Sequence, residues 1–250
     1  MRRAQIALQM YTVREHAGRD MPDTLRRLAS MGYHAVELAG YGGLGARELR
    51  AVLDEYGLRA ASAHVSFEEW KDPELVLTDL DTLGCSHAVV PMMTPEYRES
   101  EAAVARFAEE LNRLGEASER KGVEFAYHNH DFEFASLGET TIWDLLMRET
   151  DPRLVGLELD VYWARYAGVD PEILIPDLAD RISLLHLKDM APGDEKPDAP
   201  VGEGTMPWDG LLAAGDAAGV EWYIVEQDHP RDAFEDVRRS LRNLEQMADG

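Results

Sequence analysis

The sequence predicts a single (β/α)8 barrel spanning residues 1–250. Short apolar runs alternate with longer amphipathic segments along the whole chain, and eight such pairs follow one another without a linker. This alternation is typical of a parallel sheet covered by helices. The chain has 250 residues, and a closed barrel of this kind needs about 250. Eight units therefore favour a closed barrel over an open doubly wound sheet.

Each expected strand is a short run of apolar residues that ends at polar or turn-forming ones. The expected strands are residues 6–9, 35–38, 59–64, 88–91, 124–129, 154–160, 182–188 and 222–226.

Each expected helix carries its apolar residues on one stripe. In the first, Leu25 and Leu28 share a face, Pro22 occupies the first turn and Gly32 ends the helix. The expected helices are residues 22–31, 46–56, 74–83, 101–121, 141–149, 171–178, 208–218 and 231–247. Residues 190–208 are rich in Pro, Gly and Asp, so we expect an unstructured loop there that is functional or mobile.

Composition excludes several classes of partner. The formal net charge is -23, which repels nucleic-acid backbones and anionic membrane surfaces. Cys85 is the only cysteine, so no intrachain disulfide can form, and we expect its role to be structural. We see no secretory leader and no apolar run near the ~18 residues of a membrane span. We therefore expect a cytoplasmic protein that binds neither nucleic acid nor a membrane and that could form a homo-oligomer.

Ionisable residues gather where the expected strands end. In this fold the active site lies at the carboxyl ends of the strands, so His128, Asp160, His186 and Glu226 should converge there. Imidazole and carboxylate ligands suit Mn²⁺, Fe²⁺, Co²⁺ or Zn²⁺, and Mg²⁺ is an alternative. Alone, each of these residues would instead be read as a loop cap or a buried hydrogen-bonding group. Together they predict one divalent metal ion, with Mn²⁺ as the first choice.

Four further residues are candidates for substrate binding, namely Tyr11, Glu37, His64 and Trp163. Glu37 could instead pair with a nearby arginine, and His64 could be a core histidine with its hydrogen bonds satisfied. The two aromatic residues could stack on a sugar ring or simply cover the core.

Three residues are candidates for proton transfer. Lys188 follows His186 by two residues and should face the same side of its strand. A lysine with a lowered pKa can act as an acid or a base, although a salt bridge to a neighbouring carboxylate is the alternative. Glu226 and His130 are the other two candidates.

These strand ends resemble the xylose isomerase-like sugar phosphate isomerase/epimerase family of TIM barrels, and the resemblance covers essentially the whole chain. The motifs that carry it are residues 8–14, 36–40, 127–134, 159–163, 186–189, 201–205 and 225–226. They are specific for the family but not for the reaction.

The resemblance implies a metal set of Glu, Asp, His and Glu from strands five to eight. Asp160, His186 and Glu226 match the last three positions, whereas His128 stands at the first, with Glu133 close enough to be confused with it. In the family's isomerases and epimerases, two metal-bound glutamates exchange a proton on either side of the substrate. Only Glu226 clearly remains of that pair.

The expected function is a metal-dependent sugar isomerase or epimerase that works through proton abstraction next to a carbonyl and an enediolate-like intermediate. A lyase or dehydratase acting on a keto-sugar or inosose is the first alternative, and a non-enzymatic carbohydrate-binding barrel is the second. The same superfamily includes endonuclease IV, but the net charge of -23 opposes DNA binding. No basic cluster for a phosphate is evident, so a non-phosphorylated substrate is expected.

Overall fold

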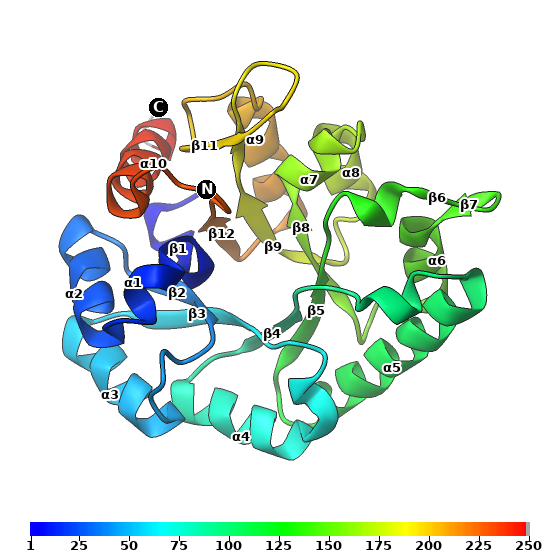
Figure 1. Ribbon diagram of the computed structural model, residues 1–250, viewed down its shortest axis with the longest axis horizontal. Coiled ribbons are helices and arrows are strands. Elements are labelled where there is room, and N and C mark those ends of the chain that lie inside the picture. The colour runs from blue at the N-terminus through cyan, green and yellow to red at the C-terminus, as the bar shows by residue number, and fades with distance from the viewer. Residues whose placement is uncertain (249–250) are drawn as a thin grey trace.

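Eight parallel strands form a closed ring at the centre of the molecule, and helices surround it (Figure 1). The computed structural model describes residues 1–248, so the last two residues of the predicted domain lie outside the description. The barrel strands are β1 (Ile6–Gln9), β2 (Ala35–Ala39), β3 (Arg59–His64), β4 (His87–Val90), β5 (Glu124–His128), β8 (Gly156–Asp160), β9 (Ile182–Leu187) and β12 (Trp222–Val225). Leu8 of β1 lies beside Val36 on one side and Val225 on the other, which closes the ring. The predicted (β/α)8 barrel is confirmed.

The helices begin and end close to the predicted residues. They are α1 (Arg14–Ala17), α2 (Met21–Met31), α3 (Ala46–Tyr56), α4 (Pro73–Leu83), α5 (Glu101–Glu119), α6 (Ile142–Glu149), α7 (Val161–Tyr166), α8 (Pro171–Asp177), α9 (Trp208–Ala218) and α10 (Ala233–Ala248). The Asp20 side chain caps α2, and Gly32 ends it in the left-handed conformation with φ 107°. The short helices α1 and α7 were not predicted. Within the described residues, no helix is both long enough and apolar enough to cross a membrane.

The inside of the barrel is layered. Because side chains alternate along a strand, every second residue points towards the axis. The middle layer consists of small and aliphatic side chains that form a cluster of their own, namely Ala7, Ala35, Ala61, Val89, Ala126, Leu184 and Ile224. Above it, at the carboxyl ends of the strands, buried polar residues take over. The apolar layer therefore separates the mouth of the barrel from its floor.

The prediction of an unstructured loop at residues 190–208 is wrong. The segment contains a short antiparallel ribbon of β10 (Asp189–Met190) and β11 (Asp198–Ala199). The buried Asp189 carboxylate accepts five hydrogen bonds, from the backbone nitrogens of Met190, Gly202, Gly204 and Met206 and from the indole of Trp208. A Cβ at Gly204 would lie 2.2 Å from an Asp189 carboxylate oxygen, so only glycine fits there.

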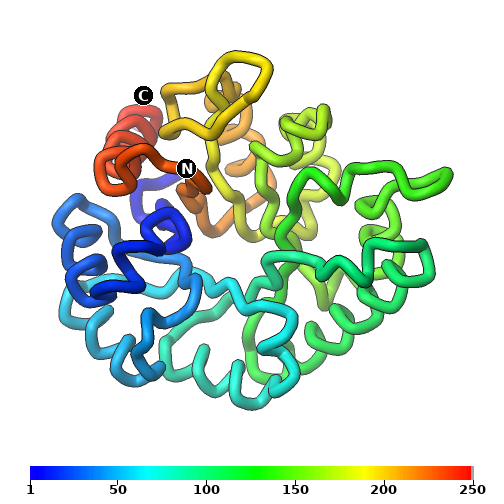
Figure 2. The backbone as a smooth tube through the Cα atoms, viewed as in Figure 1, coloured from blue at the N-terminus to red at the C-terminus, as the bar shows by residue number. Residues whose placement is uncertain are grey.

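This clasped loop also rests on the last helix. Figure 2 shows the yellow segment beside the red α10, and the Asn243 side chain donates a 2.7 Å hydrogen bond to the carbonyl of Val201. A second small ribbon, β6 (Ser136–Leu137) with β7 (Thr140–Thr141), follows β5 and projects outwards at the right of Figure 1. Both ribbons arise in long loops, where the strand and helix patterns of the sequence are weakest.

Asp189→Ala is expected to lower the free energy of unfolding by about 3 kcal/mol or more, since it leaves several buried donors without an acceptor. Urea denaturation measures the loss. Asp194→Ala, an exposed aspartate of the same loop, is the matched control and should change stability by less than about 0.5 kcal/mol. Equal stability of the two variants would show that the hydrogen bonds to Asp189 do not stabilise this loop.

Candidate metal centre and active site

The four predicted metal ligands meet at the carboxyl end of the barrel. One nitrogen or oxygen atom from each of His128, Asp160, His186 and Glu226 lies within 4.8 Å of the corresponding atoms of the others. All four side chains are buried. Two imidazoles and two carboxylates form a ligand set suited to a divalent transition metal.

The two imidazoles use their nitrogens in different directions. His128 places Nδ1 3.0 Å from Glu158 Oε2, while Nε2 lies 3.9 Å from Asp160 Oδ2. His186 places Nε2 3.1 Å from Glu158 Oε2, while Nδ1 lies 3.0 Å from Glu226 Oε2. In each ring one nitrogen therefore faces Glu158 below, and the other faces the ligand set at the mouth.

Glu158 is the central residue that the sequence analysis missed. Its Oε2 atom lies 2.6 Å from His64 Nε2, 3.0 Å from His128 Nδ1 and 3.1 Å from His186 Nε2. Atoms bound to one common zinc ion are about 3.4 Å apart, because each bond is about 2.1 Å long, so the shorter distances to His64 and His128 indicate hydrogen bonds. The hydrogen bond of His186 Nε2 goes to Glu37 instead. Burial would raise the pKa of Glu158, but the imidazoles of His186 and His64 outweigh it and lower that pKa well below its usual range.

Glu158 thus selects the ring nitrogen that His128 offers, whereas His186 is held by Glu37 through Nε2 and lies 3.0 Å from Glu226 Oε2 through Nδ1. A carboxylate that accepts a hydrogen bond from one nitrogen fixes the ring and leaves the other nitrogen free to bind metal. Burial, with His186 nearby, lowers the pKa of His128 and keeps that ring neutral. One sequence signal could have found Glu158, because it precedes Asp160 by two residues and so points to the same side of the strand.

Glu37 lies beneath the mouth and has protein partners on both oxygens. It accepts 2.6 Å hydrogen bonds from Gln9 Nε2 and from Ser62 Oγ, and it lies 2.6 Å from His186 Nε2. Its partner is thus a histidine and not the arginine that the sequence analysis considered. Burial and the negative charge of Glu158 raise the pKa of Glu37 to about 7. Its position makes Glu37 a support for His186, and its predicted contact with substrate remains untested.

Asp160 divides its two oxygens between structure and site. Oδ1 caps α7 by accepting hydrogen bonds of 2.8 Å from Tyr162 N and 3.0 Å from Trp163 N. Oδ2 is buried and accepts no hydrogen bond within residues 1–248, although Lys188 Nζ lies 3.2 Å away. Burying a carboxylate oxygen that accepts no hydrogen bond costs free energy. This oxygen fits a metal ion, because a metal bond would compensate its burial.

Lys188 lies in a network of carboxylates. Its ammonium is 2.8 Å from Asp228, 3.0 Å from Glu226 and 3.2 Å from Asp160. Burial would lower the pKa of Lys188, but these three carboxylates outweigh it and raise the pKa well above its usual value. The lowered pKa that a lysine base requires is therefore absent, and the salt-bridge alternative describes this residue.

Glu133 is not part of the cluster. Its two oxygens accept hydrogen bonds of 2.5 Å from the Tyr127 hydroxyl and 2.7 Å from the backbone nitrogen of His130. It fixes the loop after β5, and His128 is the residue of this segment that faces the mouth.

Burial, followed by the charges of His128 and Lys188, lowers the pKa of His130 to about 2, so its imidazole is neutral. His130 Nδ1 is buried without a partner in the described residues.

A cavity of about 440 Å³ opens above the cluster. His64, His128, His130 and Glu226 line it, and Tyr11, with 44% of its surface exposed, lies at its rim. Of the predicted substrate contacts, Tyr11 and His64 thus line the cavity, whereas Glu37 and Trp163 do not.

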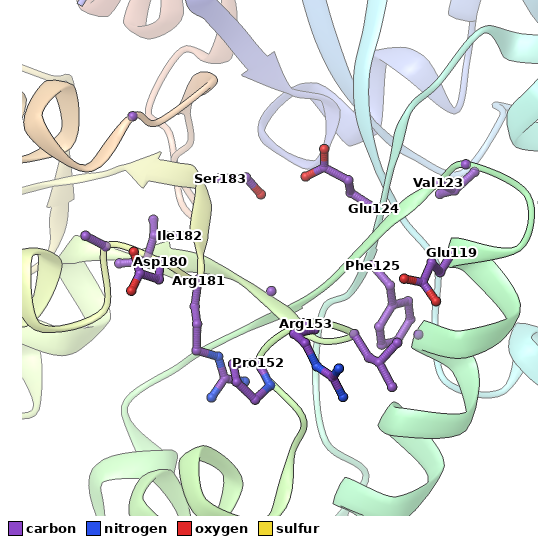
Figure 3. A pocket seen from close by; sticks show the side chains of 16 residues that line it. Glu119, Val123, Glu124, Phe125, Pro152, Arg153, Asp180, Arg181, Ile182 and Ser183 are labelled. Carbon is purple, nitrogen blue, oxygen red and sulfur yellow. The ribbon is translucent and has the colours of Figure 1, made fainter.

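Trp163 lines a neighbouring hollow of about 490 Å³, and its ring centroid is 5.7 Å from that of His130. A larger hollow, of about 570 Å³, lies at the opposite end of the barrel, where β5 and β9 begin (Figure 3). Active sites of (β/α)8 barrels lie at the carboxyl ends, so we assign the site to the smaller cavity above the cluster.

Comparison with known proteins identifies the family of the chain. The profile of the xylose isomerase-like TIM barrel family matches residues 25–247. The chain belongs to this family. An inosose dehydratase of Geobacillus kaustophilus is 30% identical over 189 residues, which cover 66% of this chain and 61% of that protein. An inosose dehydratase of Clostridium beijerinckii is 28% identical over 201 residues, with coverages of 68% and 67%.

One solved structure of a family relative is similar over nearly the whole chain. A sugar phosphate isomerase/epimerase from Parabacteroides distasonis superposes with a TM-score of 0.85 at 25% identity, covering 96% of this chain and 97% of its own. The structural match is thus almost complete, whereas the match to the first dehydratase spans about three fifths of that relative's length.

Glu158→Gln is expected to weaken binding of Mn²⁺ by about 10- to 100-fold, because a neutral amide holds the imidazoles of His64 and His128 less firmly than the carboxylate does. Isothermal titration calorimetry of the metal-stripped protein measures the affinity. Glu69→Gln is the control, since Glu69 lines the same cavity and, within residues 1–248, its side chain hydrogen-bonds only to Ser66. An unchanged affinity in the Glu158 variant would show that this residue does not orient the ligands.

Proposed function

We propose that this protein is a metal-dependent lyase that removes water from a polyhydroxy ketone, an inosose or a keto-sugar. The observation that carries the proposal is the histidine at the strand-five position. A glutamate there could exchange a proton on the second face of a substrate. Both nitrogens of His128 are instead directed at carboxylates, so the site lacks the matched pair of glutamates on which the family's epimerases depend.

His128, Asp160, His186 and Glu226 would hold the divalent ion. The bound ion would polarise the ketone oxygen and stabilise the negative charge that develops when the neighbouring carbon loses a proton. Lys188 positions Glu226 and Asp160 through its ammonium group, at 3.0 Å and 3.2 Å.

His130 is the base in this proposal; burial makes it a weak base, with a pKa of about 2, so its proton transfer would rely on the bound ion to acidify the carbon next to the ketone. Its imidazole lines the cavity and does not belong to the ligand set. It takes the proton from the carbon next to the ketone, and the electron pair of that C–H bond forms the new C=C bond. The hydroxyl on the following carbon leaves with the proton that His130 returns, so one water molecule is released and no oxidant is needed. A single base can serve both steps, whereas epimerisation needs groups on two faces.

The cavity supports an uncharged substrate. Its lining residues include four histidines but neither lysine nor arginine, so a sugar phosphate would find no fixed cation there apart from the metal. The two relatives are described as inosose dehydratases. Their descriptions support an uncharged polyhydroxy ketone as the substrate and an enzyme that acts on sugars.

An isomerase or epimerase is the second candidate, supported by the Parabacteroides distasonis relative at 25% identity. In that reaction Glu226 would be one of the proton-transfer groups, and the proton would return to a carbon instead of leaving with a hydroxyl. The two reactions share the ligand set and the ketone and differ in their product.

His130→Gln is expected to lower turnover by about 10²- to 10⁴-fold, the usual contribution of a general base, with metal content unchanged. Turnover is measured by NMR in D2O, with Mn²⁺ present and with an inosose and ketohexoses as substrates. His229→Gln is the control, because this exposed histidine lines the same cavity and should leave turnover within about twofold of the wild type.

The product distinguishes the proposals. An unsaturated ketone, or the diketone formed from it, would support the lyase, whereas a product of unchanged mass with a moved carbonyl or inverted carbon would support the isomerase or epimerase. Sugar binding that survives chelation, without any product, would leave only the carbohydrate-binding barrel.

A further inference from the structure

A second group of metal-ligating side chains lies at the floor of the barrel, at the amino ends of the strands. His87 is the first residue of β4, Glu124 is the first of β5, and Glu221 directly precedes β12. β4 and β12 stand on opposite sides of the ring. These three side chains, which we call the floor triad, bring one ligand atom each within 4.8 Å of one another.

The buried member of the floor triad has an unused nitrogen. His87 is 1% exposed, and its Nδ1 lies 3.0 Å from Ser86 Oγ. Its Nε2 has no hydrogen-bond partner within residues 1–248, yet it is directed at two carboxylates. A buried polar atom in this state costs free energy unless something binds it.

The distances indicate what that partner is. His87 Nε2 lies 3.4 Å from Glu124 Oε2 and 3.7 Å from Glu221 Oε2, which is longer than a good hydrogen bond of about 2.9 Å. Ligands in a tetrahedral zinc site, with bonds of about 2.1 Å, are separated by about 3.4 Å. His87 Nε2 therefore lies from both carboxylates at distances close to those of atoms that share an ion, unlike the imidazoles around Glu158, which lie 2.6 to 3.1 Å from its oxygen.

No other cation neutralises these carboxylates in the part of the chain that the structure describes, where His87 is the sole ion-pair partner of both. Figure 3 shows the Glu124 carboxylate pointing away from the side chains of Arg153 and Arg181. Arg153 pairs with Asp151 instead. The charge of the floor triad is thus open to a bound cation.

We propose that the floor triad binds a divalent cation of the zinc class that braces β4 and β5 to β12 across the amino end of the barrel. His87 Nε2 and one oxygen from each glutamate are the protein ligands, and water completes the coordination. The glutamate side chains are 60% and 53% exposed, which gives the ion a path from solvent. The apolar layer of the barrel separates this ion from the mouth, so the proposal does not depend on the proposed function.

The test counts bound zinc and measures its affinity in the full-length protein. The protein is stripped with a chelator, titrated with Zn²⁺ by calorimetry and checked by elemental analysis and thermal unfolding. His87→Gln and Glu124→Gln should each weaken one class of site at least tenfold and remove the rise in Tm that its filling produces. Glu119→Gln, a glutamate at the same end of the barrel, should bind zinc as the wild type does.

Two zinc sites in the wild type and one in His87→Gln would support metal binding both at the floor triad and at the mouth. One site in the wild type that the His87 and Glu124 substitutions abolish would support the floor triad and contradict metal binding at the mouth. One site, or none, that both substitutions leave unchanged would overturn the floor triad. Glu124→Gln replaces an exposed side chain, so it gives an answer even if the buried His87 variant does not fold.

Discussion

The structure depends on one electrostatic constraint, the burial of many carboxylates around one end of the barrel axis. Their cluster contains a single ammonium group, that of Lys188. The buried carboxylates are Glu37, Glu158, Asp160 and Glu226, and the partly buried Asp228 lies at their edge. Buried negative charge is costly unless cations or hydrogen-bond donors face it. The three histidines provide donors, the lysine provides one cation, and a divalent ion would provide the remaining positive charge.

The scaffold holds this cluster in place from two directions. From below, the apolar layer fills the barrel, so the polar side chains cannot move along the axis towards the floor. From the sides, loops are fixed by buried carboxylates that have no part in the cluster. Asp189 gathers the loop after β9, and Glu133 ties the loop after β5 to Tyr127. Precise placement of ligands requires such support.

The sequence predicted the regular elements because each has local signals. α3 and α9 match the predicted residues at both ends, and each is ended by a glycine in the left-handed conformation, Gly57 or Gly219. The four candidate ligands were also predictable, because strand ends converge in a closed barrel. These signals require only the neighbouring residues and the fold class.

The remaining features depend on contacts between residues that lie far apart in the sequence. The partner of Glu37 is His186, which is 149 residues away, and no local pattern indicates it. Glu158 shares a side with Asp160, but its partners come from three other strands, so its role follows from packing. The loop of residues 190–208 looked disordered because its order comes from Asp189, a single residue at its start.

Glu158 also bears on how the mouth of the barrel would take up an ion. Its carboxylate lies 3.0 Å from His128 Nδ1 and 3.1 Å from His186 Nε2, so contacts within the polypeptide orient two of the proposed ligands. Small zinc domains, in contrast, gain their fold from the metal. Here an ion would enter a preorganised receptor, and its loss would leave the barrel folded and able to be reloaded. Occupancy of the mouth would then follow the supply of ions in the surrounding medium and not the folding history of the molecule.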